Sequence, residues 1–153
     1  IRIPESYLPS IPERLKFYRR IAGADSEETL RGIQVELIDR FGPMPIQVMG
    51  LFDATRIREL AKQMGIERVG LKANSLRLYF IYNQESSFYQ SPEFGRVLEY
   101  VQTFTARVKI KQTPKHLYMI YSDVSRIKKV MIQMKELFDF VFDPYKLQGS
   151  EQV

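Results

Sequence analysis

The hydrophobic pattern of the chain changes period near residue 65, and this change limits the folds that the chain can adopt. Before it, apolar residues recur every three or four positions, as in Leu30, Ile33 and Leu37, which predicts amphipathic helices. After it, short segments such as 106–111 alternate apolar with charged residues, a pattern typical of half-buried strands. The two patterns in succession predict an α+β protein.

The first part of the chain is expected to contain three helices after an extended lead-in over residues 1–10. Pro4 and Pro9 disfavour helix in the residues before them, which predicts the lead-in. Prolines or N-cap residues suit the beginnings of the helices and glycines their ends. The predicted helices run from Pro12 to Gly23, from Asp25 as N-cap to Gly42, and from Pro45 to Gly65.

The second part of the chain is predicted to have the order ββαββα. The expected strands are 66–72, 76–82, 106–111 and 116–121; a turn at Ala73-Asn74-Ser75 joins the first pair and a polar loop at 83–90 follows it. One helix is expected from Ser91, as N-cap, to Phe104, and a last one after Asp123 as N-cap. Two hairpins with two helices predict an antiparallel four-stranded sheet with the helices packed on one face.

These elements are expected to form one compact domain, with a helical part over 11–65, a ββαββα part over 66–142 and a loose tail over 143–153. The chain has 153 residues, of which 44% are hydrophobic and 27% charged, as in a folded globular domain. It does not begin with Met, so we expect it to be a piece of a longer protein. No apolar run reaches the roughly 20 residues of a membrane-spanning helix, so no membrane partner is expected.

The residue inventory offers little catalytic chemistry. The absence of cysteine excludes disulfides, thiolate nucleophiles and thiolate metal sites, and is compatible with a reducing, cytoplasmic location. The single histidine, His116, is expected at the surface and makes no metal site by itself. No phosphate-binding glycine loop, GxSxG elbow or HExxH motif occurs. We therefore expect no catalytic residue, no metal and no cofactor, and a domain that is not an enzyme.

The first candidate binding feature is an acidic pair near the end of the second predicted helix. Leu37, Ile38 and Phe41 are expected to face the core, and the residues between them are expected to point outward: Glu36, Asp39 and Arg40. Acids at a helix C-terminus are slightly unfavourable, because the helix dipole prefers cations there. The pair therefore indicates either a partner on another surface or a solvated face in which Asp39 pairs with a nearby arginine.

The second candidate is a basic segment from Arg107 to Lys129, with seven basic residues against one acid, Asp123. Tyrosines occur on the neighbouring predicted strands, so the segment predicts either a nucleic-acid contact or a charged face that keeps the sheet soluble. The residues proposed for such a contact are Arg107, Lys109 and Lys111 on one strand, and Arg126, Lys128 and Lys129 on the last helix.

Residues 36–45, ELIDRFGPMP, resemble the hallmark of the C-terminal (TRCF) domain of the bacterial transcription-repair coupling factor (Mfd). The stretches Tyr7-Leu8-Pro9, residues 14–22 (RLKFYRRIA) and residues 60–66 (LAKQMGI) are similar to the same domain. The resemblance is dense over about residues 5–70, and after that it rests on the order of elements alone.

The resemblance implies a regulatory domain of an ATP-dependent DNA translocase in transcription-coupled nucleotide excision repair. In that family the C-terminal domain clamps a UvrB-like module of the same protein and masks recruitment of UvrA. Carried over by position, Glu36 and Asp39 would face arginines of that module, and Arg40 would be a third contact or an internal partner. Phe41, Gly42 and Pro43 would be structural. The basic segment could also touch DNA or RNA polymerase in the parent protein.

Overall fold

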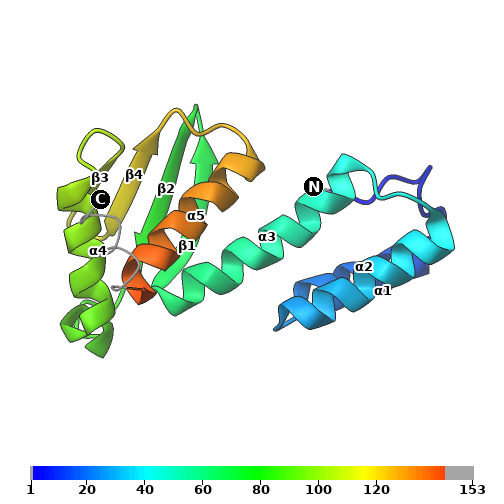
Figure 1. The fold of residues 1–153 in the computed structure, drawn as a ribbon, viewed down its shortest axis with the longest axis horizontal. Helices are drawn as coiled ribbons and strands as arrows, with labels where there is room; N and C mark the ends of the chain where they lie inside the picture. Colours follow the sequence, from blue (N-terminus) through cyan, green and yellow to red (C-terminus); the bar gives the residue numbers. More distant parts are fainter. Residues whose placement is uncertain (1, 144–153) are drawn as a thin grey trace. The chain divides into compact units, whose positions relative to one another are not determined.

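The computed structural model describes residues 2–143 and confirms the predicted α+β fold class. The helices are α1 (Ile11–Ala22), α2 (Glu27–Phe41), α3 (Ile46–Gln63), the short 3₁₀ helix η1 (Ser87–Gln90), α4 (Pro92–Thr103) and α5 (Ile127–Phe142). The strands are β1 (Ile66–Lys72), β2 (Ser75–Phe80), β3 (Val108–Gln112) and β4 (Leu117–Ser122). The order along the chain is that of the colours in Figure 1.

The chain divides into two compact units, with the boundary between Glu59 and Leu60 inside α3. The predicted division fell a few residues later, at 65. Whether the two parts form one compact domain stays a prediction. The predicted tail over 143–153 lies outside the described residues, apart from its first residue.

The first unit has its core between the lead-in and helices α1, α2 and α3. The lead-in carries no helix but turns at residues 5–7, and its apolar side chains join the core. Helices α1 and α2 run antiparallel, because Glu13 contacts Arg40 while Arg20 contacts Glu36. The buried cluster consists of Ile3, Leu8, Phe17, Ile21, Ala24, Leu30, Ile33, Leu37, Met44, Val48 and Phe52.

The beginning of α2 differs by one residue from its prediction. Ser26, not Asp25, is the N-cap, and its hydroxyl accepts a hydrogen bond from the Thr29 backbone N–H at 3.1 Å. Both residue types can cap a helix, so the sequence alone did not decide between them. The predicted N-cap at Asp25 is therefore wrong.

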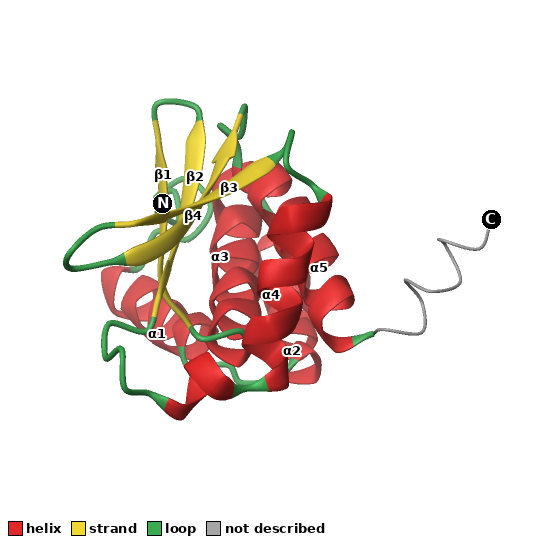
Figure 2. Ribbon diagram, turned by 90° about the vertical axis from the view of Figure 1, so that its left-hand side faces the viewer, coloured by secondary structure: helices red, strands yellow, loops and turns green. Residues whose placement is uncertain are grey.

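The second unit contains a four-stranded antiparallel sheet in the order β1-β2-β4-β3. Helices α4 and α5 pack on one face of it, as predicted (Figure 2). Leu76, Leu78, Met119 and Tyr121 point to these helices and are fully buried. The connection β1–β2 is a two-residue turn, in which both Ala73 (φ 50°) and Asn74 (φ 62°) are left-handed.

Two local features of this unit differ from expectation. The loop after β2 contains η1, and the ring of Phe88 in η1 stacks on the ring of Phe80. Helix α5 begins after Arg126, which makes no side-chain cap, so the predicted cap at Asp123 is wrong. Asp123 instead has a left-handed backbone (φ 59°) in the turn after β4. Ser91 caps α4 as predicted, accepting from the Phe94 backbone N–H at 3.2 Å.

Candidate functional site

Glu36 lies on α2 with its carboxylate against the side of α1. Its Oε2 accepts a hydrogen bond from Nη1 of Arg20 at 2.9 Å and lies 3.6 Å from Nη1 of Arg40. The hydrogen bond from Arg20, with the positive charges of Arg20, Arg40 and Lys16, lowers the pKa of Glu36 below its usual value. Glu36 is therefore ionised at neutral pH and already has a partner in its own unit.

Arg40 is likewise held inside the unit. Its Nη2 donates to both carboxylate oxygens of Glu13 at 2.8 Å, and this pairing is the main reason that the pKa of Arg40 is raised. The guanidinium also lies 4.8 Å from the ring centre of Phe41 and 5.9 Å from that of Phe17. Arg40 thus pairs with Glu13 and Glu36 inside the unit, and its role as a third contact to a partner stays a prediction.

Asp39 differs from its two neighbours. It is exposed, and within residues 2–143 its carboxylate makes no hydrogen bond or ion pair. The alternative in which Asp39 pairs with a nearby arginine is therefore not what the described residues show. Since the adjacent helix C-terminus disfavours a negative charge, Asp39 carries a small cost that nothing described in its own unit offsets.

Two large aliphatic side chains share the face of α2 with Asp39. Val35 precedes it by four residues and is 67% exposed, and Ile38 is 43% exposed. The prediction that Ile38 faces the core is wrong, whereas Leu37 is fully buried as expected. We call Val35, Ile38 and Asp39 the α2 surface. Sequence reasoning missed its apolar part, because the three-to-four-residue spacing allowed both Leu37 and Ile38 to be placed inside.

The end of α2 is fixed by the lead-in. The phenol O–H of Tyr7 lies 2.8 Å from the Gly42 carbonyl oxygen and 3.2 Å from that of Leu37. Its ring packs on Phe41, with the ring centres 5.8 Å apart. Gly42 has a φ of 87°, a conformation that glycine adopts without strain. These contacts agree with the structural role expected for Phe41 and Gly42.

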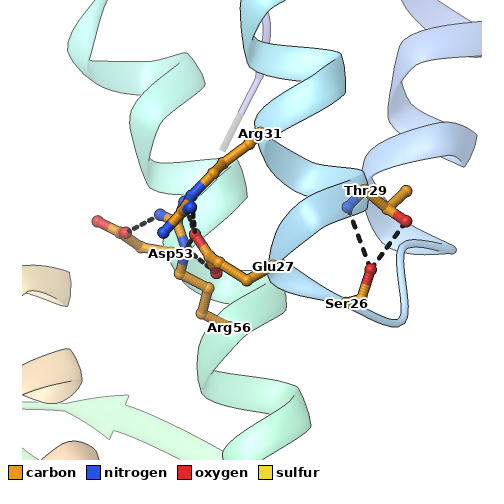
Figure 3. A network of polar contacts seen from close by, with 6 residues as sticks. All are labelled: Ser26, Glu27, Thr29, Arg31, Asp53 and Arg56. Atoms are coloured by element: carbon orange, nitrogen blue, oxygen red, sulfur yellow. Dashed lines mark hydrogen bonds and ion pairs between the residues drawn. The ribbon is translucent and has the colours of Figure 1, made fainter.

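The beginning of α2 is fixed by α3, through the charged network in Figure 3. Arg56 of α3 donates to both oxygens of Glu27, with the shortest contact at 2.9 Å, and to Asp53 at 3.0 Å. The Nε of Arg31 lies 4.0 Å from Oε1 of Glu27, the oxygen that Arg56 also contacts. Helix α2 is thus held at both ends, which gives the exposed α2 surface a rigid base.

The six cations predicted as one basic surface lie in three places in the second unit. Arg107 pairs with Glu136 of α5 at 2.6 Å, so it belongs to the helix side. Lys109 and Lys111 point to the opposite face of β3, because they alternate with the inward-facing Val108 and Ile110. The remaining three, Arg126, Lys128 and Lys129, are exposed at the beginning of α5. A nucleic-acid contact by these residues stays a prediction.

No group of three or more His, Asp or Glu side chains in residues 2–143 is placed to hold a metal ion. His116 lies beside Tyr79 and Tyr82 on the sheet. None of the helices described is both long enough and apolar enough to cross a bilayer.

Comparison with known proteins gives the fold first. The crystal structure of the C-terminal domain of a transcription-repair coupling factor superposes with a TM-score of 0.69 at 19% identity, over 91% of this chain and 87% of that one. At this identity the likeness shows the fold alone. It places the chain in the class of α+β domains that have a helical part before an antiparallel sheet.

The sequence comparisons give the family. The TRCF domain family matches residues 1–91, so the chain belongs to the TRCF domain family, the C-terminal domain of transcription-repair coupling factors. The factor of Escherichia coli (strain K12) is 43% identical over 67 residues, which are 44% of this chain and 6% of that protein. The factor of Rickettsia conorii is 29% identical over 117 residues, 76% of this chain and 10% of that protein. The matched region is thus about a tenth or less of the length of these relatives.

Proposed function

We propose that the chain is a non-catalytic regulatory domain that clamps a UvrB-like module of its parent protein through the α2 surface. The clamp covers the surface of that module to which UvrA binds, so that UvrA is recruited only when the clamp opens. The proposal rests on one observation above others: the family hallmark carries an exposed, unpaired acid, Asp39, beside two exposed aliphatic side chains.

This combination is typical of a protein interface. Apolar side chains in the middle of a contact exclude water, and a charge at their border gains strength from that exclusion. An arginine of the partner placed opposite Asp39 would satisfy the carboxylate and remove its unfavourable interaction with the end of α2. Losing one member of such a desolvated pair costs on the order of 2–5 kcal/mol of binding free energy.

Glu36 and Arg40 have a supporting role in this proposal. Because Glu36 is held by Arg20 and Arg40 by Glu13, both side chains are fixed before the partner arrives. A fixed negative charge next to Asp39 adds to the field that attracts a basic partner, and contributes mainly to orientation and association rate. Arg20, which sequence reasoning did not single out, belongs to the site as the group that holds Glu36.

The test is a calorimetric titration of the chain against the separately produced UvrB-like module. Asp39→Lys is the cleanest variant, because Asp39 has no partner among the described residues and its reversal should leave the fold intact. We expect it to weaken binding by at least about 30-fold, which corresponds to the lower end of the cost given above. Glu28→Lys, the same charge change near the other end of α2, is the matched control and should bind within about twofold of wild type.

A second variant separates the apolar contribution. Replacing Val35 and Ile38 together with serine should also weaken binding, because it removes exposed apolar area that the partner would cover. In the full-length parent, Asp39→Lys should increase capture of UvrA. Equal binding by Asp39→Lys and Glu28→Lys would place the contact elsewhere on the domain.

A further inference from the structure

One face of the sheet in the second unit is not covered by any helix described in that unit. Helices α4 and α5 both lie on the other face (Figure 2). Their residues Val97, Tyr100, Met134 and Leu137 are buried. Most sheets with one covered face have a polar opposite face. The open face of this sheet is also polar, but its charged residues are all basic and lie beside aromatic rings.

The strand register shows which residues meet on the open face. In one row across the sheet, Arg68, Tyr79, Tyr118 and Lys111 are successive neighbours from β1 to β3. In the next row the neighbours are Gly70, Arg77, Ile120 and Lys109, and beyond it Lys72, Ser75 and Ser122. We call these residues the open sheet face.

The charge of this face has a single sign. Its strand positions carry five cations, Arg68, Lys72, Arg77, Lys109 and Lys111, and no carboxylate. The nearest acid in β1, Glu67, lies at the irregular register near the beginning of the strand, where its carboxylate accepts a hydrogen bond from the Tyr82 backbone N–H at 3.3 Å. A surface of this kind attracts polyanions.

The aromatic rings of this face lie side by side. The ring centres of Tyr79 and Tyr118 are 5.1 Å apart with only 31° between their planes, and His116 lies 5.6 Å from Tyr79. The Arg68 guanidinium lies 4.0 Å from the centre of the Tyr79 ring. Hydrogen bonding from Arg77, and to a lesser degree from Arg68, lowers the pKa of the Tyr79 phenol. The two half-buried rings thus lie next to each other on β2 and β4, with cations from β1, β2 and β3 beside them.

We propose that the open sheet face binds a single-stranded nucleic acid. The five cations would contact phosphates, and bases would stack on the half-buried rings of Tyr79 and Tyr118. The guanidiniums of Arg68 and Arg77, which lie over these two rings, would turn to phosphates when a base stacks there. A duplex keeps its bases stacked inside and would use only the cations. An acidic polypeptide would likewise leave the rings without a stacking partner, so a single strand fits the whole surface best.

This site is independent of the proposed clamp. It lies in the second unit, whereas the α2 surface belongs to the first. It also differs from the basic segment predicted from the sequence: it keeps Lys109 and Lys111, adds three cations from β1 and β2, and leaves out Arg107 and the beginning of α5. Failure of either proposal therefore leaves the other untouched.

The experiment measures fluorescence anisotropy of labelled oligomers about 15 nucleotides long with the 153-residue chain. The probes are oligothymidylate, oligouridylate and a DNA duplex of the same length, with poly-glutamate as a competitor. We expect one or both single strands to bind more tightly than the duplex. Affinity should fall steeply between about 50 mM and about 200 mM salt, because phosphate contacts release counterions.

The variants separate the contribution of the aromatic rings to binding from that of the cations. Tyr118→Leu should weaken single-strand binding by about 5- to 100-fold and duplex binding much less, because it removes one stacking ring but no charge. Lys109→Gln/Lys111→Gln should weaken binding of all probes and reduce the salt dependence. Lys128→Gln/Lys129→Gln removes the same charge from α5 and is the matched control, expected to bind within about twofold of wild type. Far-UV circular dichroism checks that each variant is folded.

Four outcomes would overturn the proposal. The first is that no single strand binds at about 50 mM salt, and the second is that the two double-lysine variants lose the same amount of affinity. The third is that duplex and single strand bind equally and Tyr118→Leu has no effect on either. The fourth is that poly-glutamate at equal charge concentration displaces the single strand. The last would point to an acidic protein partner, and the third to attraction of phosphate alone.

Discussion

The substitution Gly65→Ala tests the connection between α3 and β1. Gly65 has a φ of 68°, and a Cβ placed on it would lie 2.6 Å from two carbons of the Phe88 ring. That ring is itself held between Phe80 and Phe94, with ring centres 6.0 and 5.4 Å away. The new methyl group therefore meets both a backbone that disfavours it and a neighbour that cannot easily move.

The magnitude follows from comparison with two other glycines. Gly42 has φ 87° and ψ −169°, a region that is essentially restricted to glycine, and nothing lies within 4 Å of its added Cβ, so Gly42→Ala should cost the backbone strain alone, about 1–3 kcal/mol of unfolding free energy. Gly65→Ala combines the strain of a left-handed residue, about 1–2 kcal/mol, with the clash, about 1–3 kcal/mol, for a total of roughly 2–5 kcal/mol. Gly32 lies inside α2 with open space around it, so Gly32→Ala should raise the free energy of unfolding by about 0.5–1 kcal/mol.

The assay is urea unfolding followed by far-UV circular dichroism, since the chain has no tryptophan for fluorescence. Hydrogen exchange measured segment by segment assigns each loss to its own unit. In a Phe88→Ala background the clash is absent, and Gly65→Ala should then cost no more than the strain alone. An equal cost of Gly65→Ala in the wild-type and Phe88→Ala backgrounds would refute the reasoning, because the Phe88 ring would have yielded without penalty.

Two further predictions concern charge and turn chemistry. Because the pKa of Glu36 is lowered in the folded state, its contribution to stability is complete above the carboxyl's unfolded pKa and is lost as the pH falls through the folded one. Glu36→Gln should therefore lower the free energy of unfolding by a few tenths of a kcal/mol at pH 7, because the pairing of Glu36 with Arg20 is screened by solvent. Near pH 2 the substitution should make no difference. Thermal unfolding at each pH measures both effects. Replacing the turn Ala73-Asn74 with Asn-Gly should raise stability by about 1 kcal/mol, because both positions are left-handed; an unchanged urea midpoint would contradict this.

The sequence predicted the elements well where a pattern is repeated several times. Leu30, Ile33 and Leu37 are buried as their spacing indicates, and the alternation in β3 places Val108 inside and Lys109 outside. The prediction failed where the orientation of a single residue had to be decided. Ile38 follows Leu37 directly, and periodicity alone could not show that only one of the two lies under a neighbouring helix.

The charged site was harder to predict, because its partners are distant in the sequence. Glu36 and Arg20 are 16 residues apart, and their contact depends on how α1 lies against α2. The open sheet face needs the register of β2 with β4, which brings Tyr79 next to Tyr118. A local charge count over 107–129 grouped the lysines of β3 with α5 instead, since it contains no information on which strands are neighbours.

The outer strands of the sheet, β1 and β3, each have one side without a strand partner among the described residues. Such free edges can pair with another chain and start aggregation unless charge or a bulge prevents it. Here β1 has an irregular register between Ile66 and Arg68, and β3 carries Lys109 and Lys111. The same two lysines therefore oppose edge-to-edge pairing of copies of the domain. Salt, which screens them, reduces this opposition and at the same time weakens attraction to a polyanion.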